Sequence, residues 1–179
     1  MSKIITVSGK ARHGKDTFAL AAQKYYESMN KKCLIFHYAD VLKFICKEYF
    51  GWNGIKDERG RSMLQHVGTD IVRRNSPDCW VNIASEIIKG FGDTFDYIII
   101  ADTRFPNEIT HWVETQNPNN VLNVRIERPN FDNGLTEEQK RHPSETLLDK
   151  WHFDSTIVND CSIEEFGNRV EYLLKTRNF

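Results

Sequence analysis

The chain has 179 residues, a length that suits one compact domain with a sizeable core. Its formal net charge of -1 gives no overall reason to expect binding to a nucleic acid polymer or an anionic membrane, so any recognition of phosphates must rest on local clusters of Lys and Arg. Its four cysteines form no CxxC or CxxH pair, which excludes the common zinc and dithiol spacings.

In chain order, short apolar runs alternate with longer segments of helical periodicity. The runs occupy residues 4–7, 33–36, 97–101, 121–124 and 156–158. Runs of this kind are typical of buried parallel strands. Two helices are indicated by apolar side chains at helical spacing, at Phe18, Ala22, Tyr25 and Met29 and at Ile163, Phe166, Val170 and Leu173. The alternation predicts an α/β fold with about five parallel strands flanked by helices.

Two intervals do not fit a simple crossover between strands. Residues 40–96 separate the second and third runs, and this length predicts several inserted helices. Residues 128–153 are rich in Pro, Asn, Asp and Gly, which predicts a loop with one or two short helices and a candidate lid. We therefore expect a single domain made of a core (1–39, 96–127 and 153–179), a helical insertion (about 40–95) and a lid region (about 128–152).

A glycine-rich segment joins the first strand to the first helix. Its residues are Gly9, Lys10, Ala11, Arg12, His13, Gly14, Lys15, Asp16 and Thr17. Glycines let backbone N–H groups curl inward, the helix N-terminus adds partial positive charge, and Lys15 can reach the β- and γ-phosphates of a nucleotide. The segment is predicted to bind ATP; an ordinary glycine-rich turn is the alternative.

The end of this segment departs from the usual phosphate-binding loop. The usual pattern has Ser or Thr after the lysine to bind Mg²⁺, whereas Asp16 stands there and Thr17 follows. Asp16 could hold the metal directly or through water, and Thr17 could donate to the α-phosphate. Alternatively, Asp16 is only a first-turn residue favoured by the helix dipole.

The third apolar run ends at Asp102, followed by Arg104. In a protein with a phosphate-binding loop, an Asp at the tip of the neighbouring strand lies near Mg²⁺ and the reacting phosphates. Arg104 would project from the same edge of the sheet, where open α/β sheets bind ligands. A turn residue with a surface arginine is the alternative for this pair.

The insertion carries a candidate acceptor site. Arg61, Gln65, Thr69 and Arg73 are four residues apart, so a helix would place them along one face. Arg suits a phosphate and Gln suits a base edge, although a solvated polar face fits equally well. Three further candidates are Asp40, Lys43 and Trp80. Asp40 could instead cap a helix, and Trp80 could be a half-buried core residue.

Six motifs together point to one family. They are Gly9 to Thr17, Tyr38-Ala39-Asp40 with Leu42-Lys43, Leu64-Gln65 with Gly68-Thr69 and Arg73, Asp78-x-Trp80-Val81, Asp102 to Glu108, and His142-Pro143-Ser144-Glu145. Through most of its length the chain resembles the phage deoxynucleoside monophosphate kinase family, a branch of the P-loop nucleotide kinases. In that family the Gly-Lys-Asp-Thr form of the loop is compatible with activity.

The resemblance implies ATP and Mg²⁺ as cosubstrate and cofactor, a deoxynucleoside monophosphate as acceptor, and a five-stranded core with a mobile acceptor-binding segment and lid. We assign catalysis to Lys15, Asp16, Asp102, Arg104 and Arg128, the last from the lid side. Metal binding is assigned to Asp16 and Asp102. Acceptor binding is assigned to Asp40, Lys43, Arg61, Gln65, Thr69, Arg73, Trp80, Arg104 and Glu145.

The expected chemistry is in-line transfer of the γ-phosphoryl group to an acceptor phosphate, without a covalent enzyme intermediate. One alternative is a kinase for another small phosphorylated molecule, such as phosphomevalonate. Another is a regulatory module that binds nucleotides without transfer. A Ser-His-Asp hydrolase is not supported, because the sequence has no Gly-x-Ser-x-Gly elbow.

The sequence shows neither a signal-peptide pattern nor an apolar run long enough to span a bilayer. The expected compartment is therefore the cytoplasm, that of the host if the sequence is phage-encoded. A homodimer is compatible with the sequence, which leaves the oligomeric state open.

Overall fold

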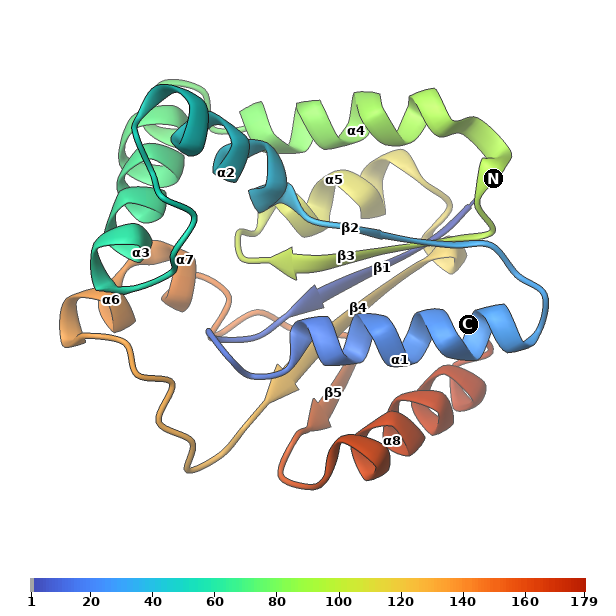
Figure 1. Cartoon of the computed structure of the whole chain (residues 1–179). Helices are drawn as coiled ribbons and strands as arrows, with labels where there is room; N and C mark the ends of the chain where they lie inside the picture. The colour runs from blue at the N-terminus through green and yellow to red at the C-terminus, as the bar shows by residue number, and fades with distance from the viewer. Residues whose placement is uncertain (1) are drawn as a thin grey trace.

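The computed structural model describes residues 2–179. Its strands are β1 (Lys3–Ser8), β2 (Cys33–Phe36), β3 (Tyr97–Thr103), β4 (Val121–Glu127) and β5 (Ser155–Val158). They form one sheet in the order β2-β3-β1-β4-β5, and every pairing is parallel (Figure 1). The predicted five-stranded parallel sheet is confirmed, and each strand includes the apolar run that predicted it.

Helices cover both faces of the sheet. On one face lie α1 (Lys15–Ser28) and α8 (Ile163–Thr176), and on the other lie α4 (Cys79–Phe91) and α5 (Asn107–Thr115) (Figure 1). Successive strand residues point to opposite faces, so Ile5 packs in the core under α1 and α8 while Ile4 packs in the core under α4. The sheet is thus buried on both sides, as its apolar strands require.

The helical faces differ slightly from the periodicity that predicted them. In α1 the fully buried tyrosine is Tyr26, which stacks on Tyr97 with ring centroids 3.6 Å apart, whereas Met29 is 43% exposed. In α8 the buried side chains include Leu174, whereas Ile163 is 80% exposed. Ile163 is the first residue of α8 and directly follows Ser162, which forms a capping box with Glu165.

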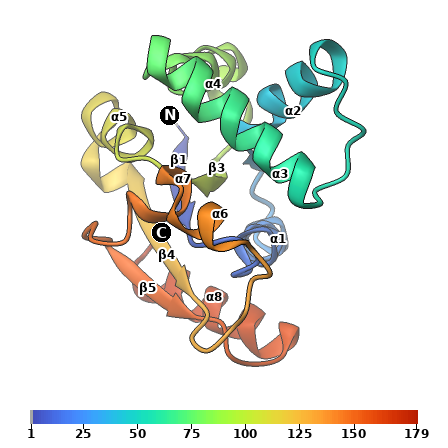
Figure 2. The ribbon, with the colours of Figure 1, turned by 90° about the vertical axis from the view of Figure 1, so that its left-hand side faces the viewer.

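Several helices stand between β2 and β3. They are α2 (Tyr38–Tyr49), α3 (Glu58–Gln65), a π-helix (His66–Arg73) that continues α3, α4, and a short 3₁₀ turn (Gly92–Thr94). Cys46, Trp52 and Val67 form a separate small core here. Figure 2 shows α2 and α3 projecting together to one side of the sheet. A π-helical stretch is uncommon and often occurs at functional sites.

A long connection between β4 and β5 crosses toward the inserted helices. It contains α6 (Glu137–Arg141) and α7 (Pro143–Thr146), while a 3₁₀ turn (Pro118–Asn120) precedes β4. The buried Gln139 Nε2 donates to the Glu58 carbonyl at 3.1 Å and to Ser62 Oγ at 3.2 Å. The α6 segment is therefore bonded to α3, with which it lies side by side in Figure 2.

Within residues 2–179, the helices lack the combination of length and apolar composition that crossing a bilayer requires.

Two glycines in the helices give a matched test of this packing. A Cβ on Gly60 would lie 2.0 Å from the Ile55 carbonyl oxygen and 2.7 Å from Trp52 Nε1, whereas a Cβ on Gly90 would meet nothing within 4 Å. Gly60→Ala is expected to lower the free energy of unfolding by about 1–3 kcal/mol because backbone cannot easily yield. Gly90→Ala is expected to raise it by up to about 1 kcal/mol, since Ala favours helix. Urea unfolding measures the free energy of unfolding of both variants. Equal changes in the two variants would contradict the close contact at Gly60.

Candidate functional site

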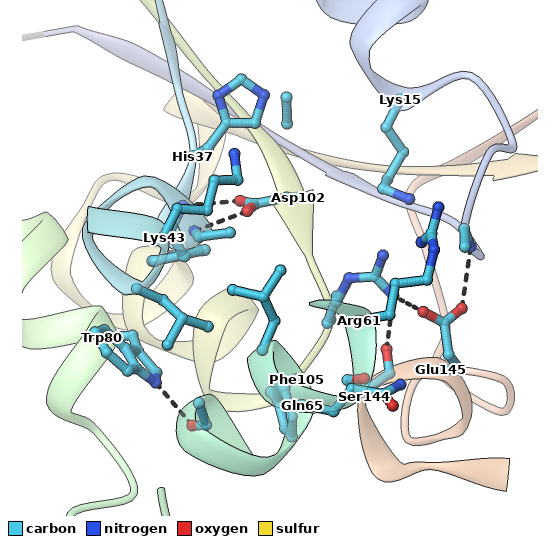
Figure 3. Close-up of a pocket in the computed structure, with 18 of the residues that line it drawn as sticks. Lys15, His37, Lys43, Arg61, Gln65, Trp80, Asp102, Phe105, Ser144 and Glu145 are labelled. Carbon is cyan, nitrogen blue, oxygen red and sulfur yellow. Dashed lines mark hydrogen bonds and ion pairs between the residues drawn. The ribbon is translucent and has the colours of Figure 1, made fainter. Parts of the chain in front are cut away.

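A cavity of about 650 Å³ opens beside the carboxyl ends of the central strands. Its walls come from the glycine-rich loop after β1, the starts of α2 and α5, the α3–π helix and α7. Figure 3 shows Lys15, Asp102 and Glu145 reaching toward this space from three separate segments. Of the predicted residues, the following line it: Ala11, Arg12, Lys15, Asp16, Lys43, Arg61, Gln65, Thr69, Arg73, Trp80, Asp102, Arg104 and Glu145.

The glycine-rich loop ends at the N-terminus of α1, whose cap is Gly14. Gly14 has φ 100°, a left-handed conformation that favours glycine. A Cβ there would also lie 2.3 Å from Asn159 Nδ2, a side-chain amide that donates to the His13 carbonyl. The loop is thus held from behind by the β5–α8 connection. Lys15 and Asp16, the first two residues of α1, line the cavity, so the N-terminus of the helix lies at a place where an anion can bind.

Lys15 is folded back onto its own loop. Its Nζ donates to the carbonyls of Gly9 at 2.7 Å and Lys10 at 2.8 Å, and the residue is only 8% exposed. Burial and, to a smaller extent, the nearby Arg104 lower the pKa of Lys15 to about 7, against the opposing effect of the surrounding carboxylates. An anionic ligand would favour the protonated amine.

Asp16 pairs with a residue that sequence reasoning did not single out. Its carboxylate lies 3.1 Å from Nε2 of His37, at the end of β2. This hydrogen bond lowers the pKa of Asp16 and raises that of His37, in both cases against the effect of burial. Because the Asp16 side chain is 81% exposed, a bound ligand can reach it.

Asp102 is anchored by backbone. Its two carboxylate oxygens accept from the N–H groups of Tyr38 and Ala39, each at 2.9 Å, so it caps the first turn of α2 (Figure 3). Asp102 therefore joins β3 to α2 in addition to lining the cavity.

Replacing Asp102 by alanine should expose this anchoring role. Asp102→Ala leaves two helix-terminal N–H groups without their acceptor, so we expect the free energy of unfolding to fall by about 1–2 kcal/mol. Asp102→Asn keeps one acceptor oxygen and should lose roughly half as much. Chemical unfolding measures both, and an unchanged stability in the alanine variant would contradict the capping role.

Two arginines each meet a buried carboxylate at the cavity wall. Arg73, at the end of the π-helix, pairs with Glu108 of α5, and Arg104 pairs with Glu145 of α7. Glu145 also accepts from the backbone N–H of Ala11 at 3.0 Å, so α7 is tied to the glycine-rich loop. The Ser144 carbonyl accepts from Arg104 Nη1 at 3.0 Å.

The other predicted acceptor residues differ in how they relate to the cavity. Arg61, Gln65 and Thr69 line the cavity from the α3–π helix. Trp80 is 4% exposed and donates from Nε1 to the Gly68 carbonyl at 3.0 Å, so it is chiefly a core residue with an edge on the cavity. Asp40 lies outside the lining; its carboxylate binds Lys43 Nζ at 2.7 Å.

A second cavity of about 510 Å³ lies on another side of the same loop. It is lined by Lys10 and His13 of the loop together with Arg128 and Phe131 from the connection after β4. The Arg128 guanidinium lies 3.8 Å from the centre of the Phe131 ring, a cation–π contact. The predicted loop residues Lys10 and His13 therefore meet the lid residue Arg128 here, and Glu145 lines this cavity as well as the main one.

Among the described residues 2–179, no three or more His, Cys, Asp or Glu side chains form a group arranged to hold a metal ion.

Sequence reasoning passed over several lining residues, among them His37, Lys56 and Glu108. His37 directly follows β2, which is the available signal, since side chains at strand carboxyl ends gather at the ligand edge. Lys56 stands in a loop without local pattern. Glu108 was part of a recognised motif, but only the structure shows that it is 2% exposed.

Comparison with known proteins gives a consistent result. The family model for deoxynucleotide monophosphate kinase matches residues 23–170. A deoxynucleotide monophosphate kinase of Escherichia phage RB69 is 29% identical over 117 residues, covering 64% of this chain and 44% of that protein. The uncharacterized protein ORF77 of Ictalurid herpesvirus 1 is 36% identical over 121 residues, covering 67% of this chain and 50% of that protein. The chain thus spans about half the length of these two curated relatives.

A third relative matches over nearly its whole length: the phosphomevalonate kinase of Drosophila melanogaster is 25% identical over 181 residues, with 92% of each protein covered.

Solved structures share the fold at low identity. A sugar kinase from Janibacter sp. superposes with a TM-score of 0.59 at 15% identity, covering 98% of this chain and 95% of that chain. The Mycobacterium tuberculosis APS kinase in complex with AMPPNP and APS gives 0.50 at 13% identity, covering 97% and 98%. The fold is therefore that of the P-loop kinases. Since the family model covers most of the chain, the protein belongs to the deoxynucleotide monophosphate kinase family.

Proposed function

We propose that this protein is a kinase that transfers the γ-phosphoryl group of ATP to a deoxynucleoside monophosphate, giving ADP and a deoxynucleoside diphosphate. The observation that carries the proposal is the convergence of the phosphate-binding loop and the arginines of the insertion on one cavity. Lys15 belongs to the loop, whereas Arg61 and Arg73 belong to the α3–π helix. A donor and an acceptor phosphate could thus meet between them.

The donor would occupy the loop, with its triphosphate at the N-terminus of α1. The second cavity supports this placement, because it offers Arg128 and the Phe131 ring beside the same loop. An aromatic ring and a guanidinium plane both suit a nucleobase. Lys15 would exchange its two carbonyl partners for phosphate oxygens.

The acceptor would occupy the main cavity. Arg73 and Arg104 would bind its phosphate, and Gln65 its base edge. Since a phosphate oxygen is already a nucleophile near neutral pH, catalysis would rest on alignment and charge stabilisation more than on a general base. The α6–α7 connection, bonded to both the loop and α3, would exclude water from the two nucleotides.

Mg²⁺ fits the site as part of a metal–nucleotide complex. Magnesium is usually held by one or two carboxylates together with substrate phosphates, and Asp16 and Asp102 both line the cavity. When bound, the ion would neutralise charge on the transferring phosphates. Asp16, with its exposed carboxylate, would hold it, while Asp102 would act through water because both of its oxygens already accept backbone N–H groups.

A kinase for another small phosphorylated molecule is the second candidate. Full-length similarity to a phosphomevalonate kinase favours it, and such an acceptor also presents a phosphate to the arginines. A regulatory module that binds ATP without transfer is the third.

An ADP-release assay with Mg-ATP distinguishes these candidates. The acceptors are a panel of deoxy- and ribonucleoside monophosphates, with phosphomevalonate alongside and a reaction without acceptor as the blank. We expect acceptor-dependent ADP with at least one deoxynucleotide. Turnover with phosphomevalonate alone would support the second candidate, and ATP binding without any turnover would support the third.

A further inference from the structure

Glu108 is the most deeply buried carboxylate at the cavity. It is 2% exposed and stands in the first turn of α5, where the helix dipole favours a negative charge. Burial raises the pKa of Glu108 to about 7, although Arg73 acts in the opposite direction. Burying a carboxylate costs free energy unless its oxygens accept hydrogen bonds. The hydrogen-bond partners of Glu108 therefore indicate its role.

One oxygen of Glu108 holds an arginine. Oε1 pairs with Nη2 of Arg73, which comes from the inserted helices and is itself only 10% exposed. The guanidinium is further fixed by the Phe105 ring, 3.8 Å from its centre, and by the Pro77 carbonyl, which accepts from Nη1 at 3.3 Å. A guanidinium has five donors, so these contacts orient Arg73 without using up its capacity for a phosphate.

The other oxygen holds the turn that carries the second arginine. Oε2 accepts from the backbone N–H groups of Arg104 at 2.6 Å and Phe105 at 3.1 Å. The direction in which the Arg104 side chain leaves β3 therefore depends on Glu108. A single carboxylate thus positions two arginines that arrive from different parts of the chain.

We infer that Glu108 is a positioning residue for acceptor-phosphate recognition: it fixes Arg73 directly and Arg104 through its backbone. The inference rests on the proposed function in that the two arginines are taken to bind the acceptor. It requires only that the acceptor carries a phosphate, whichever molecule that phosphate belongs to.

The test is the Glu108→Gln variant, which keeps the size of the side chain. A carboxamide has one acceptor oxygen and one donor group, so it cannot accept from both Arg73 and the backbone. We expect kcat/KM for the acceptor to fall about 10–100-fold, because misplaced binding groups cost this much. KM for ATP should stay within about twofold, since its loop is not bonded to Glu108. Glu108→Asp, which keeps the charge, should recover part of the loss.

A double-mutant cycle separates positioning from general structure. If Glu108 acts partly through Arg73, Glu108→Gln should lower acceptor kcat/KM by a clearly smaller factor in the Arg73→Ala background than in the wild type, and the remaining loss is the share that passes through Arg104. The inference would be overturned if the double variant showed the full product of the two single losses in acceptor kcat/KM. It would also be overturned if Glu108→Gln raised the KM for ATP as much as the KM for the acceptor. Thermal melts of each variant identify one that is unfolded, and Glu108→Asp then carries the test.

Failure of the proposed function is distinguishable from failure of this inference. If the wild-type protein uses no deoxynucleotide but does use phosphomevalonate, the same cycle is measured with that acceptor. If it uses no acceptor, the variants are titrated calorimetrically with inorganic phosphate in the presence of a saturating, non-hydrolysable ATP analogue. Glu108→Gln should then weaken phosphate binding at least about tenfold, and unchanged binding would overturn the inference.

Discussion

Replacing Lys15 by methionine is expected to lower kcat for phosphoryl transfer by about a thousandfold. The Lys15 amine is buried at the N-terminus of α1 and reaches two carbonyls of its own loop. In the proposed complex it instead binds the phosphates on which charge develops. Methionine has similar length and no charge, so the packing at the 8%-exposed position is largely kept while the charge is lost.

The matched control is Lys89→Met. Lys89 lies in α4 and pairs with Glu86 at 2.9 Å, but its side chain is 66% exposed. Surface pairs of this kind contribute little to stability, so activity should remain at the wild-type level. Steady-state ADP release at saturating acceptor measures both variants, and a Lys15→Met protein with full activity would refute the assignment of the loop.

The sheet could be predicted from sequence because its strands are buried on both sides. A two-sided core requires continuous apolar runs, and such runs are visible without tertiary information. The glycine-rich loop was equally visible, since its backbone geometry demands glycine at a position such as Gly14, with φ 100°. These two features predict an α/β fold with a phosphate-binding loop, whereas the kinase assignment came from the resemblance that the six motifs carry together.

Partnerships at the site could not be predicted, because they join residues far apart in the chain. Asp102 was assigned to the metal from its place at the end of a strand, yet both of its oxygens accept from the backbone of α2. The bond between Arg73 and Glu108 joins residues 35 positions apart. No local periodicity encodes such contacts.

The face of the inserted helix was predicted for the wrong helical geometry. Spacing of four residues assumes an α-helix, but the chain is π-helical over His66–Arg73. A π-helix has more residues in each turn than an α-helix, so two residues four positions apart are separated by less than one full turn around the helix axis. Gln65, Thr69 and Arg73 nevertheless all line the cavity, because the α3–π segment passes along its wall.

Replacing Arg73 by alanine is expected to lower acceptor kcat/KM by about a hundredfold, while KM for ATP changes little. Arg73 lines the cavity with an oriented guanidinium, whereas the neighbouring Arg74 is exposed. Arg74→Ala is therefore the matched control, and its kinetics should equal those of the wild type. Equal losses in the two variants would show that general charge, and not a placed arginine, attracts the acceptor.

The same substitution should destabilise the protein in a pH-dependent way. Without Arg73, the carboxyl of Glu108 stays buried and loses the cation that lowers its pKa, while Asp102 still raises it. The pKa of Glu108 in the folded variant should then exceed the wild-type value of about 7. An acid whose pKa is raised by folding weakens the folded state as pH increases, because only the unfolded state ionises freely.

The stability lost by Arg73→Ala relative to wild type should therefore be greater at pH 8 than at pH 6, growing by up to about 1.4 kcal/mol for each pH unit above 7. Urea unfolding at the two pH values measures the difference. Adding Glu108→Gln to Arg73→Ala removes the titrating group, so the pH dependence should disappear in the double variant. If it persists there, another group is responsible, and the arginine does not hold the charge of Glu108.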